Sequence, residues 1–286
     1  MNIDWVEGRV PKIDLPRLRK LCSGELKEED ESRFCFRYPN NCKGMGEIWC
    51  RLAKKFGTEV FELNCEVVQV AVGEKKLTYK NLLDDTTHTI SYDRLLSTIP
   101  ITELNKLSNH IIPSLSLSHS KVILVGVALH LPQNQLASQF SWAYYPRPET
   151  VFYRSTVISN FSDNMTPDNS KYWSVLCEIG RKPEDNIDEV VMIKDVIRDL
   201  IEVGLVDSED QVHSTWFQII PYGYPIPTIN RKAEMDKCHK TLEKQQVYSR
   251  GRFGSWHYET SNQDNCFEIG RCLINRLYLD IAEPPF

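Results

Sequence analysis

The sequence predicts a mixed α/β fold that combines part of a parallel sheet with an antiparallel sheet and several helices. Residues 122–129, within KVILVGVALHL, form an apolar run with the length and composition of a buried strand. Residues 186–204 carry apolar side chains at helical spacing. Residues 249–270 predict a strand that turns tightly into a helix, and such strand and helix patterns alternate to the end of the chain.

Composition places the chain among ordinary globular proteins. Its 286 residues can form one large or two modest domains, and 41% are hydrophobic while 26% are charged. The net charge of −5 offers no basic field, so we expect neither nucleic acid nor an anionic membrane surface as a partner. Any anionic ligand must therefore be held by local arginines.

Targeting and cysteine signals point to a reduced compartment. The longest apolar run is too short to cross a bilayer, and the first residues lack the apolar core of a signal peptide. Nine cysteines, an odd number without a CxxC pair, indicate free thiols and no structural metal site. We therefore expect a cytoplasmic protein that binds no metal.

In the first half of the chain, a helix is expected near residues 15–21. Residues 34–57 predict a short aromatic strand, a glycine turn and an amphipathic helix whose apolar side chains face inward: Ile48, Trp49, Leu52 and Ala53. Further strands are expected at 59–63, 66–70, 77–79 and 87–90, and a buried parallel strand lies within 92–100.

In the second half, strands are expected at 119–130, 172–179 and 211–220, with His130 as a structural histidine. The helix of 186–204 ends at Gly204, and a polar helix spans 231–246. The last helix is expected to bury the stripe formed by Phe267, Gly270, Ile274, Leu277 or Tyr278, and Ile281.

The stretch from 249 to 270 has the residues of an anion site. Arg250 and Arg252 lie beside flexible glycines, and Thr260, Ser261 and Asn262 are good N-caps ahead of the helix. A helix N-terminus offers unpaired N–H groups and the positive end of the dipole, which suits a phosphate. The alternative is an ordinary β-turn-α corner with both arginines as surface charges.

One segment resembles the C-terminal FAD-binding signature of eukaryotic-type UDP-galactopyranose mutases. It reads RGRFGSW and is followed by YE, two small residues, NQD and a helix. FRYP, the IW pair of the following helix and GYPIPT resemble further segments of that family. The resemblance implies a partly complete FAD-binding, Rossmann-like sheet beside an antiparallel substrate sheet. It also implies interconversion of UDP-galactopyranose and UDP-galactofuranose, with reduced FAD as the nucleophile.

The same resemblance implies the site residues. Arg9 and Arg154 would clamp the substrate diphosphate, because a guanidinium offers paired donors at fixed geometry. The other implied substrate residues are Trp142, Tyr144, Phe161, Tyr224 and Tyr258. The implied cofactor residues are Gly46, Val67, Arg252, Ser261, Asn262 and Gln263. Phe161 stands where a tyrosine is usual, which removes a hydroxyl donor worth roughly 1 kcal/mol.

The resemblance also divides the chain. Residues 1–33 and 101–246 would form the substrate-binding portion, and 34–100 with 247–286 would form the remaining part of the FAD-binding domain. The GxGxxG turn that opens flavoproteins of this class is missing, so we expect a truncated form of the enzyme.

Two other functions stay open at this stage. The first is an FAD-dependent amine oxidase or protoporphyrinogen oxidase-like enzyme, which needs an apolar substrate cavity. The second is a non-catalytic, truncated remnant that binds a nucleotide sugar. The expected partner is a UDP-sugar, and the oligomeric state is open, a homo-oligomer included.

Overall fold

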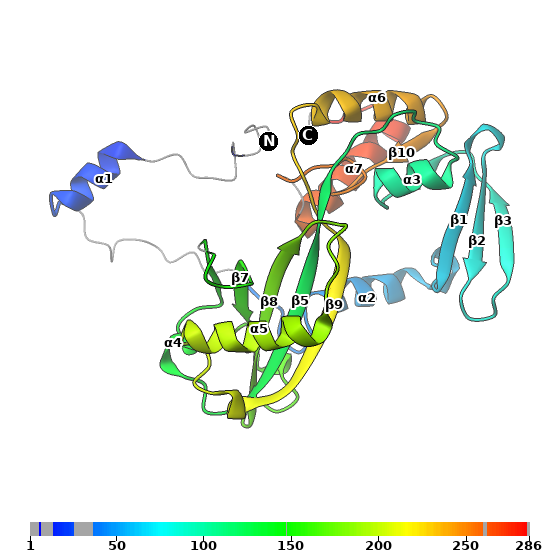
Figure 1. Cartoon of the computed structure of the whole chain (residues 1–286). Coiled ribbons are helices and arrows are strands. Elements are labelled where there is room, and N and C mark those ends of the chain that lie inside the picture. Colours follow the sequence, from blue (N-terminus) through cyan, green and yellow to red (C-terminus); the bar gives the residue numbers. More distant parts are fainter. Residues whose placement is uncertain (1–5, 7–13, 26–36, 147, 260–261, 285–286) are drawn as a thin grey trace.

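The computed structural model describes residues 6, 14–25, 37–146, 148–259 and 262–284, and it confirms the mixed α/β fold (Figure 1). The helices are α1 Leu15–Cys22, α2 Gly46–Phe56, α3 Ile101–Leu107, α4 Gln135–Ser138, α5 Glu189–Glu202, α6 Arg231–Glu243 and α7 Gln263–Leu279. The strands are β1 Cys65–Ala71, β2 Lys76–Asn81, β3 Thr87–Ser91, β4 Leu95–Ser97, β5 His119–His130, β6 Trp142–Tyr144, β7 Arg154–Val157, β8 Tyr172–Arg181, β9 Val212–Pro225 and β10 Val247–Ser249. Short 3₁₀ turns lie at Thr58–Val60, Val72–Glu74, Ile158–Asn160, Asp163–Met165 and Glu209–Gln211.

The larger sheet is antiparallel, with five strands in the order β6-β7-β8-β5-β9. Helix α5 crosses one face of it (Figure 1). Alternate residues of β5, including Ile123, Val125 and Val127, pack with Val196 and Leu200 of α5 to form the first core. Because side chains alternate along a strand, the intervening residues of β5, β7 and β8 point to the other face, which we call the open face.

A second core lies at the far end of the long strands. There β4 and β10 pair in parallel, and β1, β2 and β3 form an antiparallel sheet. Its buried residues include Val70, Ile101, Leu242, Val247 and Trp256. The Trp256 indole nitrogen donates to the carbonyl oxygen of Ser118, just before β5, at 3.2 Å. Strands β5 and β9 thus connect the two cores.

Most expected strands are confirmed, and β9 continues five residues beyond the predicted end to Pro225. The strand expected at 59–63 is wrong. Thr58–Val60 is a 3₁₀ turn, and Phe61 and Leu63 are exposed. The first ladder begins only at Cys65, which pairs with Asn81, and no strand of the described residues pairs with 59–63. The aromatic residues at 34–36 lie outside the described residues.

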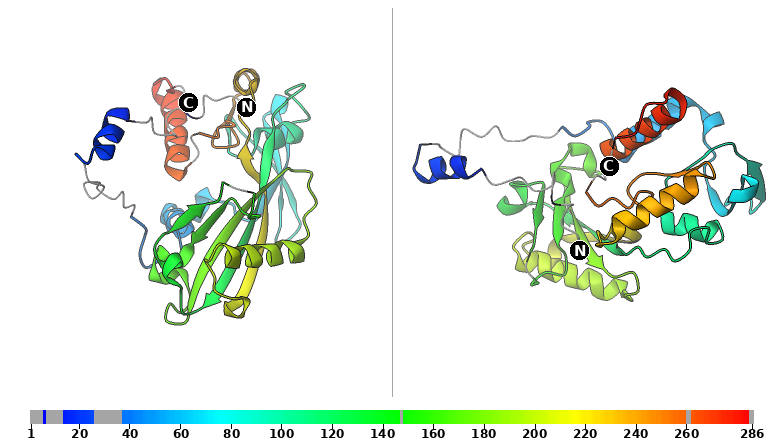
Figure 2. Two further views of the ribbon diagram at one scale, coloured as in Figure 1. Left: turned by 60° about the vertical axis from the view of Figure 1, so that its left-hand side comes forward. Right: turned by 90° about the horizontal axis from the view of Figure 1, so that it is seen from above.

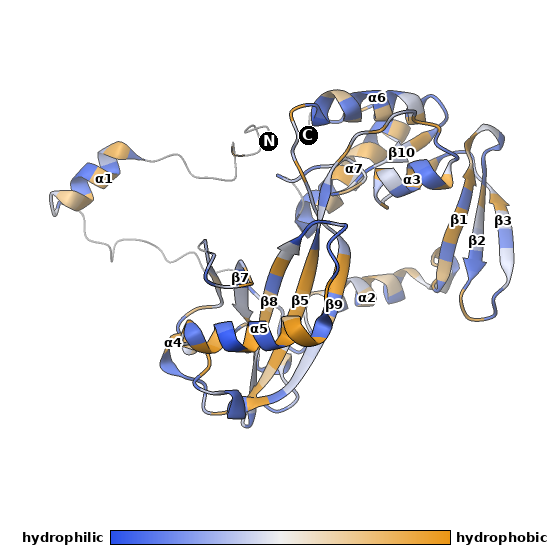
Figure 3. Ribbon diagram, in the orientation of Figure 1, coloured by the Kyte–Doolittle hydropathy of each residue, from blue (hydrophilic) through white to orange (hydrophobic). Residues whose placement is uncertain are grey.

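The burial predicted for helices α2 and α7 is wrong. In α7 the buried residues are Ile269, Cys272 and Leu273, while the predicted stripe is exposed at Phe267, Ile274, Tyr278 and Ile281. In α2 no residue is fully buried, and Ile48, Trp49 and Leu52 are each at least 36% exposed. Figure 3 shows the apolar positions of α2 and α7 together with those of β5, β8 and α5. Both helices are amphipathic, but the apolar stripe predicted for each is largely exposed in the described part of the chain.

His130, predicted to be a structural histidine, is exposed at the end of β5, where its ring centroid lies 4.9 Å from that of His213 and 5.4 Å from that of Tyr172. Helix α1 lies apart from the other elements in every view (Figures 1 and 2). Within the described part of the chain, no helix has both the length and the apolar character to cross a membrane.

Candidate functional site

The open face of the large sheet carries a row of polar side chains. In the strand register Tyr144 of β6 lies opposite Arg154 of β7, which lies opposite Glu178 of β8, which lies opposite Leu124 of β5. Directly opposed residues on adjacent strands share a face and contact one another. The backbone pairing alone therefore brings a tyrosine, an arginine and a glutamate side by side.

Arg154 is held along one edge of its guanidinium group. Its Nε donates to Glu178 Oε1 at 2.8 Å, and its Nη2 donates to the same oxygen. On the other side, Nη1 lies 3.4 Å from the Tyr144 hydroxyl. Burial disfavours the charge on Arg154, but its bonds to Glu178 and Tyr144 outweigh burial and raise the pKa of the guanidinium above its ordinary value.

Two tyrosines extend this row across the sheet. The Tyr153 hydroxyl donates to Glu178 Oε2 at 2.6 Å and lies 3.5 Å from the Tyr224 hydroxyl at the end of β9. Burial, followed by the bonds to Glu178 and Tyr224, raises the pKa of Tyr153 well above its ordinary value. Tyr153 is therefore a neutral hydrogen-bond donor at physiological pH.

The turn after β10 completes the row. The Arg252 guanidinium carbon lies 5.1 Å from the centroid of the Tyr224 ring, a cation–π distance. The rings of Tyr224 and Tyr258 are 5.8 Å apart. Two arginines and four tyrosines, together with Glu178, thus form one connected set, which we call the Arg–Tyr cluster: Tyr144, Tyr153, Arg154, Glu178, Tyr224, Arg252 and Tyr258.

Trp142 and Phe161 lie beside the cluster. Trp142 is two residues before Tyr144 on β6 and so shares its face. Its ring is nearly parallel to that of Phe161, with ring centroids 6.4 Å apart. The Phe161 ring also packs against that of Tyr38, with ring centroids 5.0 Å apart. The structure therefore brings six predicted substrate residues to one face of the sheet, and the seventh, Arg9, lies outside the described residues.

The predicted cofactor residues lie in three places. Gly46 is the first residue of α2 and Gln263 the first of α7, and the two helices are joined by a 2.8 Å bond from Trp49 Nε1 to Gln263 Oε1. Asn262 precedes α7 with an extended backbone. Arg252 belongs to the Arg–Tyr cluster, whereas Val67 lies on β1 and packs against the second core. Ser261 lies outside the described residues.

Arg250, in contrast, is neither an anion ligand nor a surface charge. It is 6% exposed, and its guanidinium bonds to Glu243 of α6 and to Glu283 after α7. Arg276 bonds to the same two glutamates, at 3.1 and 2.9 Å. These four residues form a closed ring of alternating charge, the charge ring, in which Arg250 is fully engaged.

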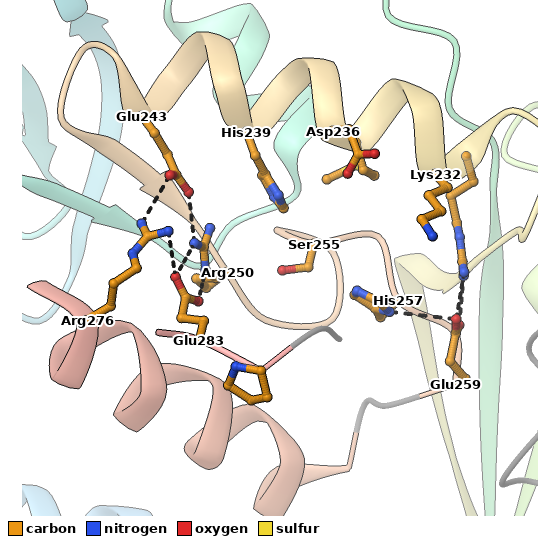
Figure 4. A pocket seen from close by; sticks show the side chains of 13 residues that line it. Lys232, Asp236, His239, Glu243, Arg250, Ser255, His257, Glu259, Arg276 and Glu283 are labelled. Carbon is orange, nitrogen blue, oxygen red and sulfur yellow. Dashed lines mark hydrogen bonds and ion pairs between the residues drawn. The ribbon is translucent and has the colours of Figure 1, made fainter. Parts of the chain in front are cut away.

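The charge ring closes one end of a cavity of about 490 Å³ between α6, α7 and the turn after β10 (Figure 4). At the other end Arg231 makes two bonds to Glu259, at 2.6 and 2.7 Å. His239 and His257 lie between these ion pairs, and burial is the main cause that lowers the pKa of each imidazole. Among the described residues, no three His, Cys, Asp or Glu side chains cluster to hold a metal ion.

Glu178 and the cavity were missed at the sequence level. Glu178 stands in the buried stretch between Cys177 and Ile179, and a carboxylate in such a strand needs a cationic partner nearby. That signal could have identified it. The cavity had no such signal, because its ion pairs join residues up to 33 positions apart in the chain: Arg231, Glu243, Arg250, Glu259, Arg276 and Glu283.

No family model matches the sequence. Among solved structures, the chain is similar to a UDP-galactopyranose mutase in its reduced form, with a TM-score of 0.83 and 26% identity over 99% of this chain and 62% of that chain. It is also similar to a proposed protoporphyrinogen oxidase from Exiguobacterium sp. 255-15, with a TM-score of 0.60 and 17% identity over 83% of this chain and 51% of that chain. A third similar structure is a fatty acid isomerase from P. acnes, with a TM-score of 0.52 and 13% identity over 75% of this chain and 47% of that chain. The chain therefore spans less than two thirds of the mutase it resembles, and the other two structures share its fold alone.

Proposed function

We propose that this chain is a UDP-galactopyranose mutase-like flavoprotein that interconverts UDP-galactopyranose and UDP-galactofuranose with reduced FAD. The Arg–Tyr cluster carries this proposal. A diphosphate presents several acceptor oxygens, and the cluster offers two guanidinium groups and the hydroxyls of Tyr144, Tyr224 and Tyr258, whereas the Tyr153 hydroxyl donates to Glu178. The similarity to a reduced UDP-galactopyranose mutase over 99% of the chain supports it further.

In this proposal each residue has a defined task. Arg154 presents its Nη1 edge, beside the Tyr144 hydroxyl, to one phosphate. Tyr224 and Tyr258 donate hydrogen bonds from their hydroxyl groups to the diphosphate, and Arg252 contributes the second positive charge beside them. The aromatic pair of Trp142 and Phe161 shields one side of this region from water.

Several described residues suit FAD. Among the described residues, Asn262 makes no side-chain hydrogen bond to the first turn of α7, and the N-terminus of this 17-residue helix suits an anion such as a phosphate of FAD because its first N–H groups have no acceptor within the helix. Gln263 is fixed beside them by its bond to Trp49. When bound, reduced FAD would supply the nucleophile, and the protein's share is to hold substrate and cofactor in place.

The test is a titration of UDP by calorimetry on the parent and on Arg154→Ala, Arg154→Lys and Phe161→Tyr. Charge-assisted bonds contribute about 1.5–3 kcal/mol, so Arg154→Ala should weaken UDP binding roughly ten- to a hundredfold. Arg154→Lys should recover part of the affinity, because an ammonium keeps the charge but lacks the paired donors. Phe161→Tyr should strengthen binding slightly.

Arg271→Ala is the matched control, since Arg271 bonds to Glu268 on the exposed surface of α7 and has a side chain 54% exposed. It should bind UDP like the parent. Equal affinities of the parent and Arg154→Ala would contradict the proposal.

An FAD-dependent oxidase is the second candidate, and the similarity in fold to a proposed protoporphyrinogen oxidase is the observation in its favour. The charged and phenolic open face argues against it, because such a substrate needs an apolar cavity. UDP binding with the Arg154 dependence above would favour the mutase-like function. A flavin absorption spectrum after gel filtration would separate both enzymes from a non-catalytic nucleotide-sugar binder.

A further inference from the structure

Glu178 is the most buried charged group of the Arg–Tyr cluster. It is 7% exposed, and it makes three hydrogen bonds: from Arg154 Nε at 2.8 Å, from Arg154 Nη2, and from the Tyr153 hydroxyl at 2.6 Å. A carboxylate so far from water is stable only when its oxygens are paired with donors. Both of its oxygens meet this condition through residues of the candidate site.

These bonds determine the orientation of Arg154. Two donors on one edge of the guanidinium converge on Glu178 Oε1, which fixes the plane of the group. Nη1 then lies on the opposite side, 3.4 Å from the Tyr144 hydroxyl, and the Arg154 side chain is 30% exposed. A free arginine side chain loses rotamer entropy when a ligand orders it, and a side chain that is already fixed avoids most of that loss.

The other oxygen of Glu178, Oε2, holds the Tyr153 hydroxyl next to that of Tyr224. It accepts from Tyr153, whose hydroxyl lies 3.5 Å from that of Tyr224. Because one carboxylate contacts both residues, it fixes the spacing between the guanidinium of Arg154 and the two hydroxyls. The strand register supports this, since Arg154 and Glu178 are directly opposed on β7 and β8.

We propose that Glu178 is the positioning residue of the diphosphate site: it holds one edge of Arg154 so that the other edge meets a phosphate of the nucleotide sugar. This inference rests on the function proposed above. The charge of Glu178 itself repels a diphosphate, so its benefit to binding comes from orientation alone.

Two substitutions separate orientation from charge. Glu178→Gln keeps an oxygen that accepts from Arg154 and removes the charge, so UDP affinity should stay within about threefold of the parent or increase. Glu178→Ala removes the anchor as well, so UDP affinity should fall about tenfold, even though a negative charge has also been lost. Uridine, which has no phosphate, should bind the parent and both variants alike.

The control is Asp199→Ala. Asp199 is also a buried carboxylate bonded to an arginine, Arg198, and it accepts from the backbone N–H of Val151. It belongs to α5, which covers the other face of the sheet. Asp199→Ala should therefore change stability without a selective loss of UDP over uridine.

The experiment combines UDP and uridine calorimetry with the Arg154 Nε–H signal in ¹H–¹⁵N spectra, assigned by its loss in Arg154→Lys. The signal should be protected from solvent exchange in the parent and in Glu178→Gln, and it should lose that protection in Glu178→Ala. If Glu178→Ala binds UDP as tightly as the parent, or loses uridine and UDP equally, the positioning role is overturned. An unchanged Arg154 signal in Glu178→Ala overturns it whether or not UDP binds, whereas a parent that fails to bind UDP overturns the proposed function.

Discussion

Replacing Arg250 by methionine tests whether the charge ring holds the C-terminal helix to the rest of the molecule. Arg250 is 6% exposed, and it bonds to Glu283 at 2.8 and 2.9 Å, to Glu243 at 2.8 Å and to the carbonyl oxygen of Ser249 at 2.9 Å. Burial disfavours its charge, but the bonds to Glu283 and Glu243 outweigh burial and raise the pKa of Arg250 above its ordinary value. The guanidinium is therefore charged at every pH at which the protein is folded.

The expected loss follows from what remains after the substitution. Removing one partner of a buried ion pair costs about 3–5 kcal/mol, because the other charge is left without compensation. Arg276 still bonds to both glutamates, at 3.1 and 2.9 Å, so the loss should lie at the lower end, at about 3 kcal/mol. Methionine keeps much of the buried volume, so the lost packing adds little.

Urea denaturation followed by tryptophan fluorescence measures this loss, since Trp256 is fully buried in the turn that begins at Arg250. Arg271→Met is the control. Its pair with Glu268 is exposed to solvent and should contribute little to stability. Equal midpoints for Arg250→Met and Arg271→Met, at equal slopes, would show that the charge ring does not stabilise the fold.

Two further predictions concern pH and packing. The lowered pKa values of His239 and His257 mean that the fold favours neutral imidazoles, so the urea midpoint should fall as the pH drops below about 6.5, and it should fall less in His239→Phe. Burial disfavours the charge on Glu259, but its bonds to Arg231 outweigh burial and hold its pKa at about 2. The stability that this carboxylate contributes should therefore be lost separately, between about pH 4.5 and 2. A single acid transition that His239→Phe leaves unchanged would contradict both assignments. A Cβ at Gly223 would lie 2.5 Å from Val122 Cγ2 and 2.9 Å from its backbone nitrogen, so Gly223→Ala should lower the free energy of unfolding by about 1–3 kcal/mol, whereas Gly73→Ala, with open space around the added carbon, should lower it far less.

The sequence predicted the strands of the large sheet well because their periodicity and their burial agree. Residues 119–130 and 172–179 are apolar enough to require a core, and both lie at the centre of the sheet. The strand at 59–63 failed because apolar content alone does not provide a partner strand. Phe61 and Leu63 have strand-like composition, but the ladder starts beyond them at Cys65.

Helix α7 shows the limit of pattern arguments. It carries apolar residues on more than one side, so its periodicity fits two different buried stripes. The structure buries the one that contains Ile269, Cys272 and Leu273, and no local pattern encodes that choice. Arg250 was misjudged for the same reason, because its partners Glu243 and Glu283 come from other elements.

The candidate site was predicted from resemblance rather than from local chemistry. The resemblance named Arg154, Tyr224 and Tyr258, and the structure places them on one face, whereas their role in binding stays a prediction. Glu178 lay outside the resemblance but within reach of a physical argument, since a buried carboxylate requires a cation.

The register of β7 links the packing of the core to the orientation of Arg154. Arg154 lies on the open face because its neighbours Ser155 and Val157 are buried on the side that α5 covers. A slip of β7 by one residue would turn the guanidinium into that core and expose Val157. The apolar pattern that selects the native register of β7 therefore also determines which face of the sheet carries the Arg154 guanidinium. As long as that register is kept, Tyr144, Arg154 and Glu178 stay opposite one another. Any substitution that disturbs the burial of Ser155 or Val157 therefore disturbs the row from Tyr144 to Glu178 as well.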